Sequence, residues 1–198
     1  YASVTVTGAV DPGATFTADP VLSPTGVPAL ANELRILVPP DGAVTDWEQV
    51  TVVGTVLNPA SQVTVNGIAA EVVGNRFTAR HVALSPGPNG IQASAVALGL
   101  PNAVSGVSVE RSDSPVLDVE LFSPPDGATI PGGGLVVRGW VSAKGAMTWA
   151  ADRFVPLTEG LFEATEVDVG AGAFEIAAIA RLPEDPAEVK DTVRVTSA

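Results

Sequence analysis

The feature that most constrains this chain of 198 residues is an internal repeat. Pro39-Pro40-Asp41-Gly42-Ala43 recurs further along the chain as Pro124-Pro125-Asp126-Gly127-Ala128. Further glycine and apolar positions match at the same offset of 85 residues (124 − 39 = 85). These pairs are Gly54 with Gly139, Phe77 with Phe162, Ala79 with Ala164 and Ile91 with Ile176. A self-similarity that keeps one register over this length predicts two copies of one folding unit.

The repeat divides the chain into three parts. We predict one domain at residues 34–113 and a second at residues 114–198, each within the size range of small domains. Residues 1–33 belong to neither copy and form an N-terminal extended segment, in which Asp19–Asn32 carries three prolines and is typical of an extended linker.

Each copy predicts seven short β-strands and almost no helix. Apolar residues alternate with polar ones at period two, as in Leu34/Ile36/Val38, so each strand has one buried face. Asn66-Gly67 and Gly74-Asn75 lie between such runs and predict tight hairpin turns, because Asn and Gly tolerate positive φ. Short strands at this spacing predict a β-sandwich.

Three local features refine this prediction. The core pattern breaks phase once in each copy, which predicts a β-bulge that points His81 and Glu166 away from the core. Gly54 and Gly139 lie in mid-strand, where a missing side chain indicates close approach by neighbouring backbone. The second copy has Trp149-Ala150-Ala151-Asp152 in place of the Val-Asn-Gly turn, so we expect a different hairpin there.

These motifs carry a resemblance. The run from Pro-Pro-Asp-Gly-Ala through Val-Thr-Val-Asn-Gly and Gly-Asn-x-Phe-x-Ala resembles the bacterial Ig-like modules typified by the glucodextranase B-type domain, well over residues 34–110 and more loosely over 119–198. The resemblance implies an all-β fold of two tandem Ig-like β-sandwiches with an N-terminal β-strand extension. Such modules occur in cell-surface adhesins and filaments and as non-catalytic parts of secreted enzymes.

Composition excludes several functional classes. With no Cys, the chain has no disulfide scaffold, thiolate metal site or Cys nucleophile. A net charge of −12 argues against a nucleic-acid partner, because phosphate binding needs a basic surface. The longest uncharged stretch, Val82 to Val109, is broken by prolines and glycines, so no membrane span is predicted. The composition favours export, and we expect an extracellular or cell-surface location after removal of a signal peptide.

No catalytic site or cofactor is predicted. His81 is the only histidine and there is no Gly-x-Ser-x-Gly elbow, so a solvated strand residue is favoured over a Ser-His-Asp triad. The carboxylates of Glu163, Glu166 and Asp168, or of Asp46 and Glu48, fit solubilising surface charge better than glycoside hydrolysis. Asp113 and Asp118 flank the linker between the copies and are weak candidates for Ca²⁺ ligands.

Two tryptophans are candidates for exposed contact residues. Trp140 alternates out of phase with Val137 and Val141 and should face outward, and Trp47 falls in the loop before a strand. Exposed Trp serves as a sugar platform or an interface anchor, and the alternative is a lid over the sandwich rim or the domain junction. Trp149 is expected in the core.

The N-terminal segment is open to three interpretations. Val4, Val6 and Val10 form an apolar stripe of strand character. The segment is the tail of a preceding domain, an extra strand on its own sandwich, or a strand donated to another subunit. Donation is slightly favoured and makes these three valines a subunit interface.

We therefore expect a non-enzymatic structural subunit of an extracellular or cell-surface assembly that self-associates through its N-terminal strand or binds other surface proteins. The alternative is an accessory or carbohydrate-binding module of a secreted polysaccharide-degrading enzyme, for which the partner is a glycan. The source organism, the ligand and the assembly symmetry do not follow from the sequence.

Overall fold

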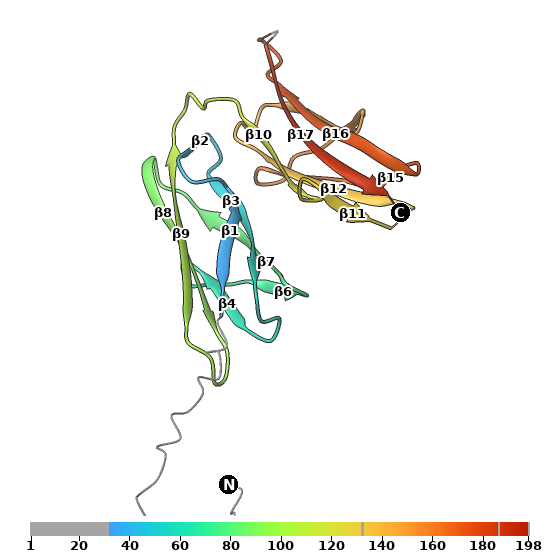
Figure 1. Cartoon of the computed structure of the whole chain (residues 1–198). Coiled ribbons are helices and arrows are strands. Elements are labelled where there is room, and N and C mark those ends of the chain that lie inside the picture. The colour runs from blue at the N-terminus through green and yellow to red at the C-terminus, as the bar shows by residue number, and fades with distance from the viewer. Residues whose placement is uncertain (1–31, 132, 186, 198) are drawn as a thin grey trace, which may run out of the picture. The chain divides into compact units, whose positions relative to one another are not determined.

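The computed structural model describes residues 32–197, apart from 132 and 186, and residues 31–198 form one compact unit. The described residues are all-β and contain no helix. They form two tandem Ig-like β-sandwiches (Figure 1), as predicted. Val4, Val6 and Val10, with most of the predicted N-terminal extension, lie outside the described residues.

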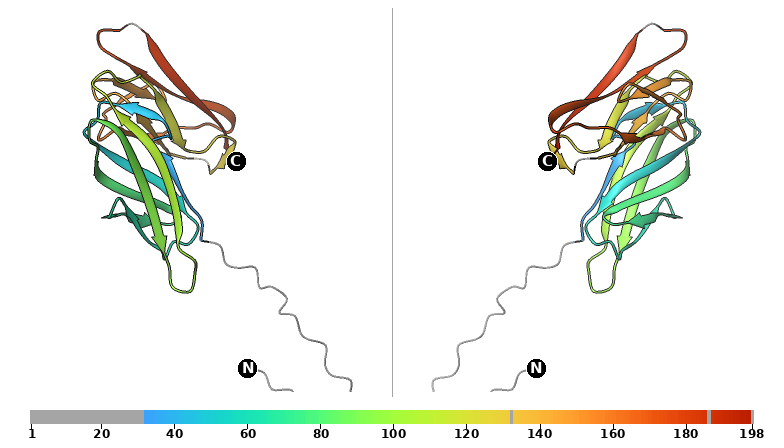
Figure 2. Two further views of the ribbon diagram at one scale, coloured as in Figure 1. Left: turned by 90° about the vertical axis from the view of Figure 1, so that its left-hand side faces the viewer. Right: turned by 90° about the vertical axis from the view of Figure 1, so that its right-hand side faces the viewer.

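The first sandwich has two sheets of short strands, and Figure 2 shows its layers from two sides. One sheet contains, in spatial order, β1 (Leu34–Val38), β3 (Gln49–Val56), β7 (Arg76–Ala83) and β6 (Glu71–Val73). The other contains β2 (Ala43–Thr45), β9 (Ala103–Arg111), β8 (Gly87–Val96), β4 (Gln62–Val65) and β5 (Ile68–Ala69).

The second sandwich repeats this order with one strand fewer among the described residues. Its smaller sheet contains β10 (Val119–Ser123), β12 (Leu135–Val141) and β15 (Leu161–Val167). Its larger sheet contains β11 (Ala128–Ile130), β17 (Glu188–Ser197), β16 (Gly172–Arg181), β13 (Met147–Ala150) and β14 (Arg153–Val155).

Among the described residues, the first copy has nine strands and the second has eight, and the repeated Pro-Pro-Asp-Gly turn accounts for one strand beyond the predicted seven in each copy. It moves the chain from one sheet to the other, so that β1 pairs antiparallel with β3 while β2 pairs parallel with β9. The Asp41 carboxylate accepts a hydrogen bond from the Ser108 N–H at 2.7 Å, and Asp126 accepts one from the Arg194 N–H at 2.8 Å. The same aspartate therefore holds the same turn against the last strand in both copies.

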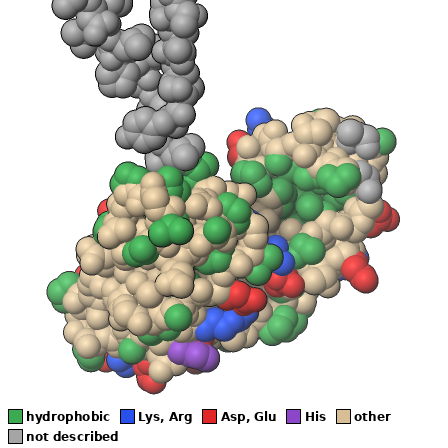
Figure 3. All heavy atoms as spheres, turned by 90° about the horizontal axis from the view of Figure 1, so that it is seen from below, with side chains coloured by type: hydrophobic (Ala, Val, Ile, Leu, Met, Phe, Trp, Pro, Cys, Tyr) green, Lys and Arg blue, Asp and Glu red, His purple; other side chains and the backbone are tan. Residues whose placement is uncertain are grey.

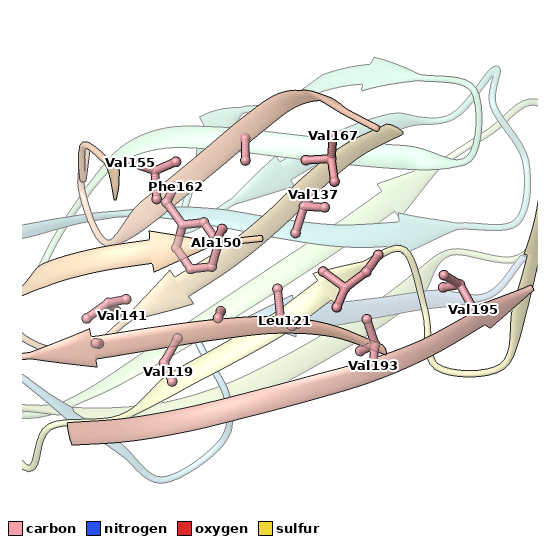
Figure 4. Packing of buried hydrophobic residues seen from close by; sticks show 14 of the residues in the cluster. Val119, Leu121, Val137, Val141, Ala150, Val155, Phe162, Val167, Val193 and Val195 are labelled. Atoms are coloured by element: carbon pink, nitrogen blue, oxygen red, sulfur yellow. The ribbon is translucent and has the colours of Figure 1, made fainter. Parts of the chain in front are cut away.

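The predicted cores are confirmed. The phenylalanines at the repeated position, Phe77 and Phe162, are both buried. The aliphatic side chains around Phe162 point into the space between the two sheets (Figure 4). An added Cβ at Gly54 or Gly139 would overlap the Phe ring and a backbone oxygen of the neighbouring strand. Each mid-strand glycine therefore makes room for an aromatic ring as well as for backbone.

Both predicted bulges are present. His81 has φ of 59° and Glu166 has φ of 54°, and both side chains are exposed. In the first sandwich the register shifts between Val50 and Val52, and the second sandwich shows the same irregularity. Two residues of one strand therefore face one residue of its partner, as in a β-bulge.

Two expectations for the second copy are wrong. Ala151 and Asp152 have φ of 49° and 62°, and Asn66 and Gly67 have φ of 46° and 83°. Both hairpins therefore use the turn with two residues at positive φ, and the copies share this turn although they differ in its residues. Trp149 is half-buried on the outer sheet face rather than in the core. The reason is that Trp149 is equivalent in the repeat to the exposed Thr64, and not to Val65.

Within the part of the chain that the structure describes, there is no helix of the length and hydropathy that a membrane span requires.

Candidate functional site: the junction between the sandwiches

The junction contains a small apolar core of its own. Trp140 of β12 packs with Phe122 of β10 and with Val38 and Val53 of the first sandwich. The expectation that Trp140 is solvent-exposed is wrong, because its side chain is 0% exposed. It does point out of its own sandwich, as the alternation predicts, but the first sandwich covers it. The alternative interpretation of Trp140 as a junction residue is the correct one.

Polar contacts surround this core. Trp47 is half-buried rather than exposed, and its indole N–H donates to the Val141 carbonyl at 3.1 Å. The Thr45 hydroxyl donates to the Ser142 carbonyl. The Asp46 carboxylate accepts from the Lys144 N–H at 2.7 Å. The end of β2 and the loop after it thus bind the end of β12 and the backbone that follows it.

A turn of the second sandwich reaches the bulge of the first. Glu159 and Gly160 connect β14 to β15 with φ of 51° and 85°. The Glu159 carboxylate accepts hydrogen bonds from the Thr51 hydroxyl at 2.6 Å and from the His81 N–H at 2.9 Å, and it also contacts His81 Nδ1. The Glu159 carbonyl accepts from the Thr51 N–H at 3.1 Å. The bulge therefore presents the two donors that bind this carboxylate.

The electrostatics of Glu159 favour the charged form. Its side chain is 14% exposed, and burial alone raises the pKa of a carboxyl. The hydrogen bonds from Thr51 and His81 outweigh that burial and lower the pKa of Glu159 below its usual 4.5. The junction is therefore assembled around an ionised carboxylate.

A second carboxyl near the junction shows the opposite shift. Burial, followed by the charges of Asp118 and Asp191, raises the pKa of Glu120, and the charge of Arg35 opposes this only in part. Glu120 therefore disfavours the folded state at neutral pH, in contrast to Glu159.

The described part of the chain begins and ends far from this junction. The Glu33 carbonyl accepts a hydrogen bond from the Leu57 N–H at 2.8 Å, beside the end of β3 that is remote from Thr51. In the second sandwich, β17 ends with Ser197 opposite Gly172, at the end remote from Val141. Glu33 and Ser197 therefore both lie at the end of their sandwich that is remote from the junction.

A groove of about 610 Å³ opens beside the junction between β6 and β7 of the first sandwich and β12 and β15 of the second. Its lining includes three arginines, Arg76, Arg80 and Arg138, although the whole chain has only 10 Lys and Arg. Arg76 lies over the Phe122 ring at 5.5 Å, and Arg138 Nε contacts Glu163 Oε2 at 2.6 Å. Burial, together with the Arg138 charge, lowers the pKa of Arg76. Glu71 and Glu163 also line the groove, which therefore brings three guanidinium groups and two carboxylates together.

The predicted metal and catalytic candidates do not converge. The described residues contain no group of three or more His, Asp or Glu that could hold a metal ion, so Asp113 and Asp118 belong to no such cluster. Both are exposed, and the Asp118 carboxylate accepts from the Val119 N–H. His81 is 72% exposed, and Figure 3 shows the histidine at the surface near basic and acidic side chains.

Sequence reasoning missed Glu159. In the first copy the equivalent position is Gly74, which has φ of 58°. A glutamate at a position that favours glycine is costly for the backbone, and this cost is the signal that could have identified it. Val53 and Phe122 are a second sequence signal of the junction, because both are apolar side chains at outward-facing strand positions.

No family model matches the chain, and no curated protein matches it. Solved structures that match the chain include fibronectin(III)-like modules of Clostridium thermocellum CbhA, with 18% identity, 83% of this chain and 93% of that chain covered, and a TM-score of 0.36. The BSP domain of a biofilm-associated protein has 16% identity over 79% of this chain and 29% of that chain, with a TM-score of 0.47. A tetra-tandem repeat from the extending region of a large adhesion protein has 16% identity over 85% of this chain and 50% of that chain, with a TM-score of 0.32. The resemblance to the glucodextranase B-type domain stays a resemblance.

Proposed function

We propose that the chain is a non-enzymatic structural module of an extracellular or cell-surface assembly, in which copies associate through the N-terminal segment. The observation that carries the proposal is the junction, where Trp140 is fully buried and Glu159 binds the bulge of the other sandwich. These contacts couple two sandwiches into one compact unit. Such coupling suits a rigid spacer between two attachment points.

The course of the chain supports the same role. Glu33 and Ser197 lie at the ends of the two sandwiches that are remote from the junction, so a force applied between these two residues acts across both sandwiches and the junction. The acidic net charge of −12 keeps separate copies apart unless a specific contact overcomes it. The N-terminal segment supplies that contact in this proposal.

The test is self-association of the full chain and of a variant that lacks residues 1–10, measured by multi-angle light scattering over a concentration series. We expect the full chain to form oligomers or filaments and the truncated chain to remain monomeric. Polymers that persist after truncation, or a full chain that is strictly monomeric at high concentration, would contradict the proposal.

The second candidate is an accessory or carbohydrate-binding module, and one observation favours it. Trp149 and the 63% exposed Phe154 meet edge to face at 5.9 Å on the outer face of β13 and β14, with Arg181 over the Trp149 ring at 5.3 Å. Exposed aromatic faces stack on sugar rings. Quenching of tryptophan fluorescence by soluble polysaccharides, lost in Trp149→Ala but retained in Trp47→Phe, would favour this candidate.

A further inference from the structure

Comparison of the two sandwiches shows that the second lacks a strand at one sheet edge among the described residues. In the first, β6 covers the edge of β7, with Glu71 opposite Thr78 and Val73 opposite Arg76. In the second, the described pairing at the same place is one bridge between Thr158 and Leu161. Pro156 stands at the position of Glu71, and a proline has no N–H for a ladder hydrogen bond. Within the described structure, the edge of β15 beyond Leu161 is therefore open.

The backbone geometry shows which groups this edge presents. The Val141 N–H donates to the Gly160 carbonyl, toward β12, whereas Leu161 exchanges both hydrogen bonds with Thr158, on the outer side. The backbone N–H and C=O groups of successive residues point to alternate sides of an antiparallel strand. The N–H groups of Glu163 and Thr165 therefore point outward, like that of Leu161. Neither N–H has a hydrogen-bond acceptor among the described residues, whereas the Thr165 carbonyl accepts from Arg153 at 3.0 Å.

The edge adjoins the groove, which the start of β15 helps to line. Glu163 is 48% exposed and Thr165 is exposed, so the outward N–H groups of this edge are accessible to an added strand, although Arg153 already binds the Thr165 carbonyl. The guanidinium groups of Arg80 and Arg138 supply positive charge nearby, and Glu71 and Glu163 are the acidic residues of the same lining. An unpaired edge of this kind is a template for β-strand addition.

A segment that could supply the missing strand is in the chain itself. Residues 1–31 carry Asp11 and Asp19 and no Lys, Arg or His, and they begin with the alternating run Val4-Thr5-Val6-Thr7. Antiparallel or parallel addition of this run would place its valines on the core side, near Phe162 and Ala164, and its threonines on the outer side. In the antiparallel arrangement Asp11, which follows the run, would lie toward the start of β15, on the side of the groove arginines.

We infer that the open edge of β15 is the acceptor site for the N-terminal segment of a second copy of this chain, which adds to the sheet as the missing strand. The inference rests on the proposed function, namely that copies associate through this segment. A second copy is favoured over the same chain because the chain enters the first sandwich at the pole remote from the junction. In addition, Pro20, Pro24 and Pro28 favour extension over reversal.

Disulfide trapping tests this directly, because the chain has no native Cys. One copy carries Thr5→Cys and the other, with a tag of different mass, carries Glu163→Cys. Cross-strand neighbours on one sheet face have Cβ atoms about 4.5–5.5 Å apart, within reach of a disulfide after small adjustment. Thr7→Cys is tested in parallel, so that two registers are sampled.

The matched control is Thr78→Cys, the residue equivalent to Glu163 in the first sandwich, where β6 covers the edge. We expect at least about a tenfold excess of the crosslinked heterodimer with Glu163→Cys over Thr78→Cys, because a bound segment raises the effective concentration of its thiol. Equal crosslinking, or crosslinking confined to a single chain carrying both cysteines, would overturn the inference.

A backbone test complements the trapping. Glu163→Pro removes the outward N–H at an edge position, where proline is tolerated, whereas Glu163→Ala removes only the side chain. We expect Glu163→Pro to abolish association and Glu163→Ala to retain it, with both variants showing the far-UV circular dichroism of the unmodified chain. If the unmodified chain associates and Glu163→Pro associates equally well, the acceptor site is wrong; if the unmodified chain never associates, the proposed function itself fails.

Discussion

Replacement of Glu159 by Ala is the sharpest test of the junction. The change removes the acceptor for the Thr51 hydroxyl at 2.6 Å and for the His81 N–H at 2.9 Å. Thr51 is fully buried, so its hydroxyl is left without a partner. A hydrogen bond to a charged group contributes about 1.5–3 kcal/mol, and a buried unsatisfied donor costs about 1–3 kcal/mol. We therefore expect a loss of about 2–4 kcal/mol in the coupling between the sandwiches.

The measurement is urea unfolding followed by tryptophan fluorescence, because two of the three tryptophans, Trp47 and Trp140, lie at the junction. With a slope of about 2 kcal/mol/M, the predicted loss shifts the midpoint by about 1–2 M. Glu163→Ala is the control, because its ion pair with Arg138 is partly exposed and contributes at most about 1 kcal/mol. Equal midpoints for the Glu159 and Glu163 variants would refute the assignment of the carboxylate as the element that couples the sandwiches.

The positive φ of Glu159 allows a second variant, Glu159→Gly, to be compared in the same experiment. Glu159 has φ of 51°. This conformation costs a residue with a side chain about 1 kcal/mol more than it costs glycine. Glu159→Gly loses the same hydrogen bonds as Glu159→Ala but relieves this strain, so we expect it to be about 1 kcal/mol more stable than the alanine variant. The opposite order would contradict the turn geometry.

Four further outcomes are expected. Phe162→Ala should lower the free energy of unfolding by about 3–5 kcal/mol, measured in urea, and a loss below about 1 kcal/mol would contradict its core position. Gly139→Ala should lower it by about 1–3 kcal/mol through overpacking against the Phe162 ring, and an unchanged melting temperature would argue against that packing. Ala151 has φ of 49°, so Ala151→Gly should raise the free energy of unfolding by about 1 kcal/mol; destabilisation would count against the shared turn. The Glu159 pKa is lowered on folding, so the stability advantage over Glu159→Gln should be full above pH 4.5 and decline as the pH falls through the lowered pKa; an advantage that is constant with pH would exclude ionisation as its source.

The sequence predicts the fold well because the repeat and the period-two alternation are local signals. Phe77 and Phe162 lie in the two cores, and the bulges at His81 and Glu166 follow from one change of phase. The error with Trp149 came from an offset of one residue, and one residue inverts the face of a strand.

The junction was less predictable because its signal is not local. Alternation places Trp140 on the outward face of β12, but only the tertiary structure shows that a second sandwich covers that face. Glu159 makes its contacts across 108 and 78 residues of sequence, and no periodic pattern encodes such a pairing. Pro156 indicates an exposed edge of β15 only once the pairing between Thr158 and Leu161 shows that Pro156 precedes the segment beside β15.

The two copies differ in sequence at the junction, where each provides one of two complementary surfaces. The second copy has Val136 where the first has Thr51, so it offers no hydroxyl to receive a carboxylate, and the first copy has Gly74 where the second has Glu159. A first-copy domain therefore cannot dock onto another first-copy domain through these groups, nor a second onto a second. Tandem repeats that stay alike risk exchanging elements and misassembling during folding. Divergence at this interface therefore disfavours association of like domains from separate chains through these groups.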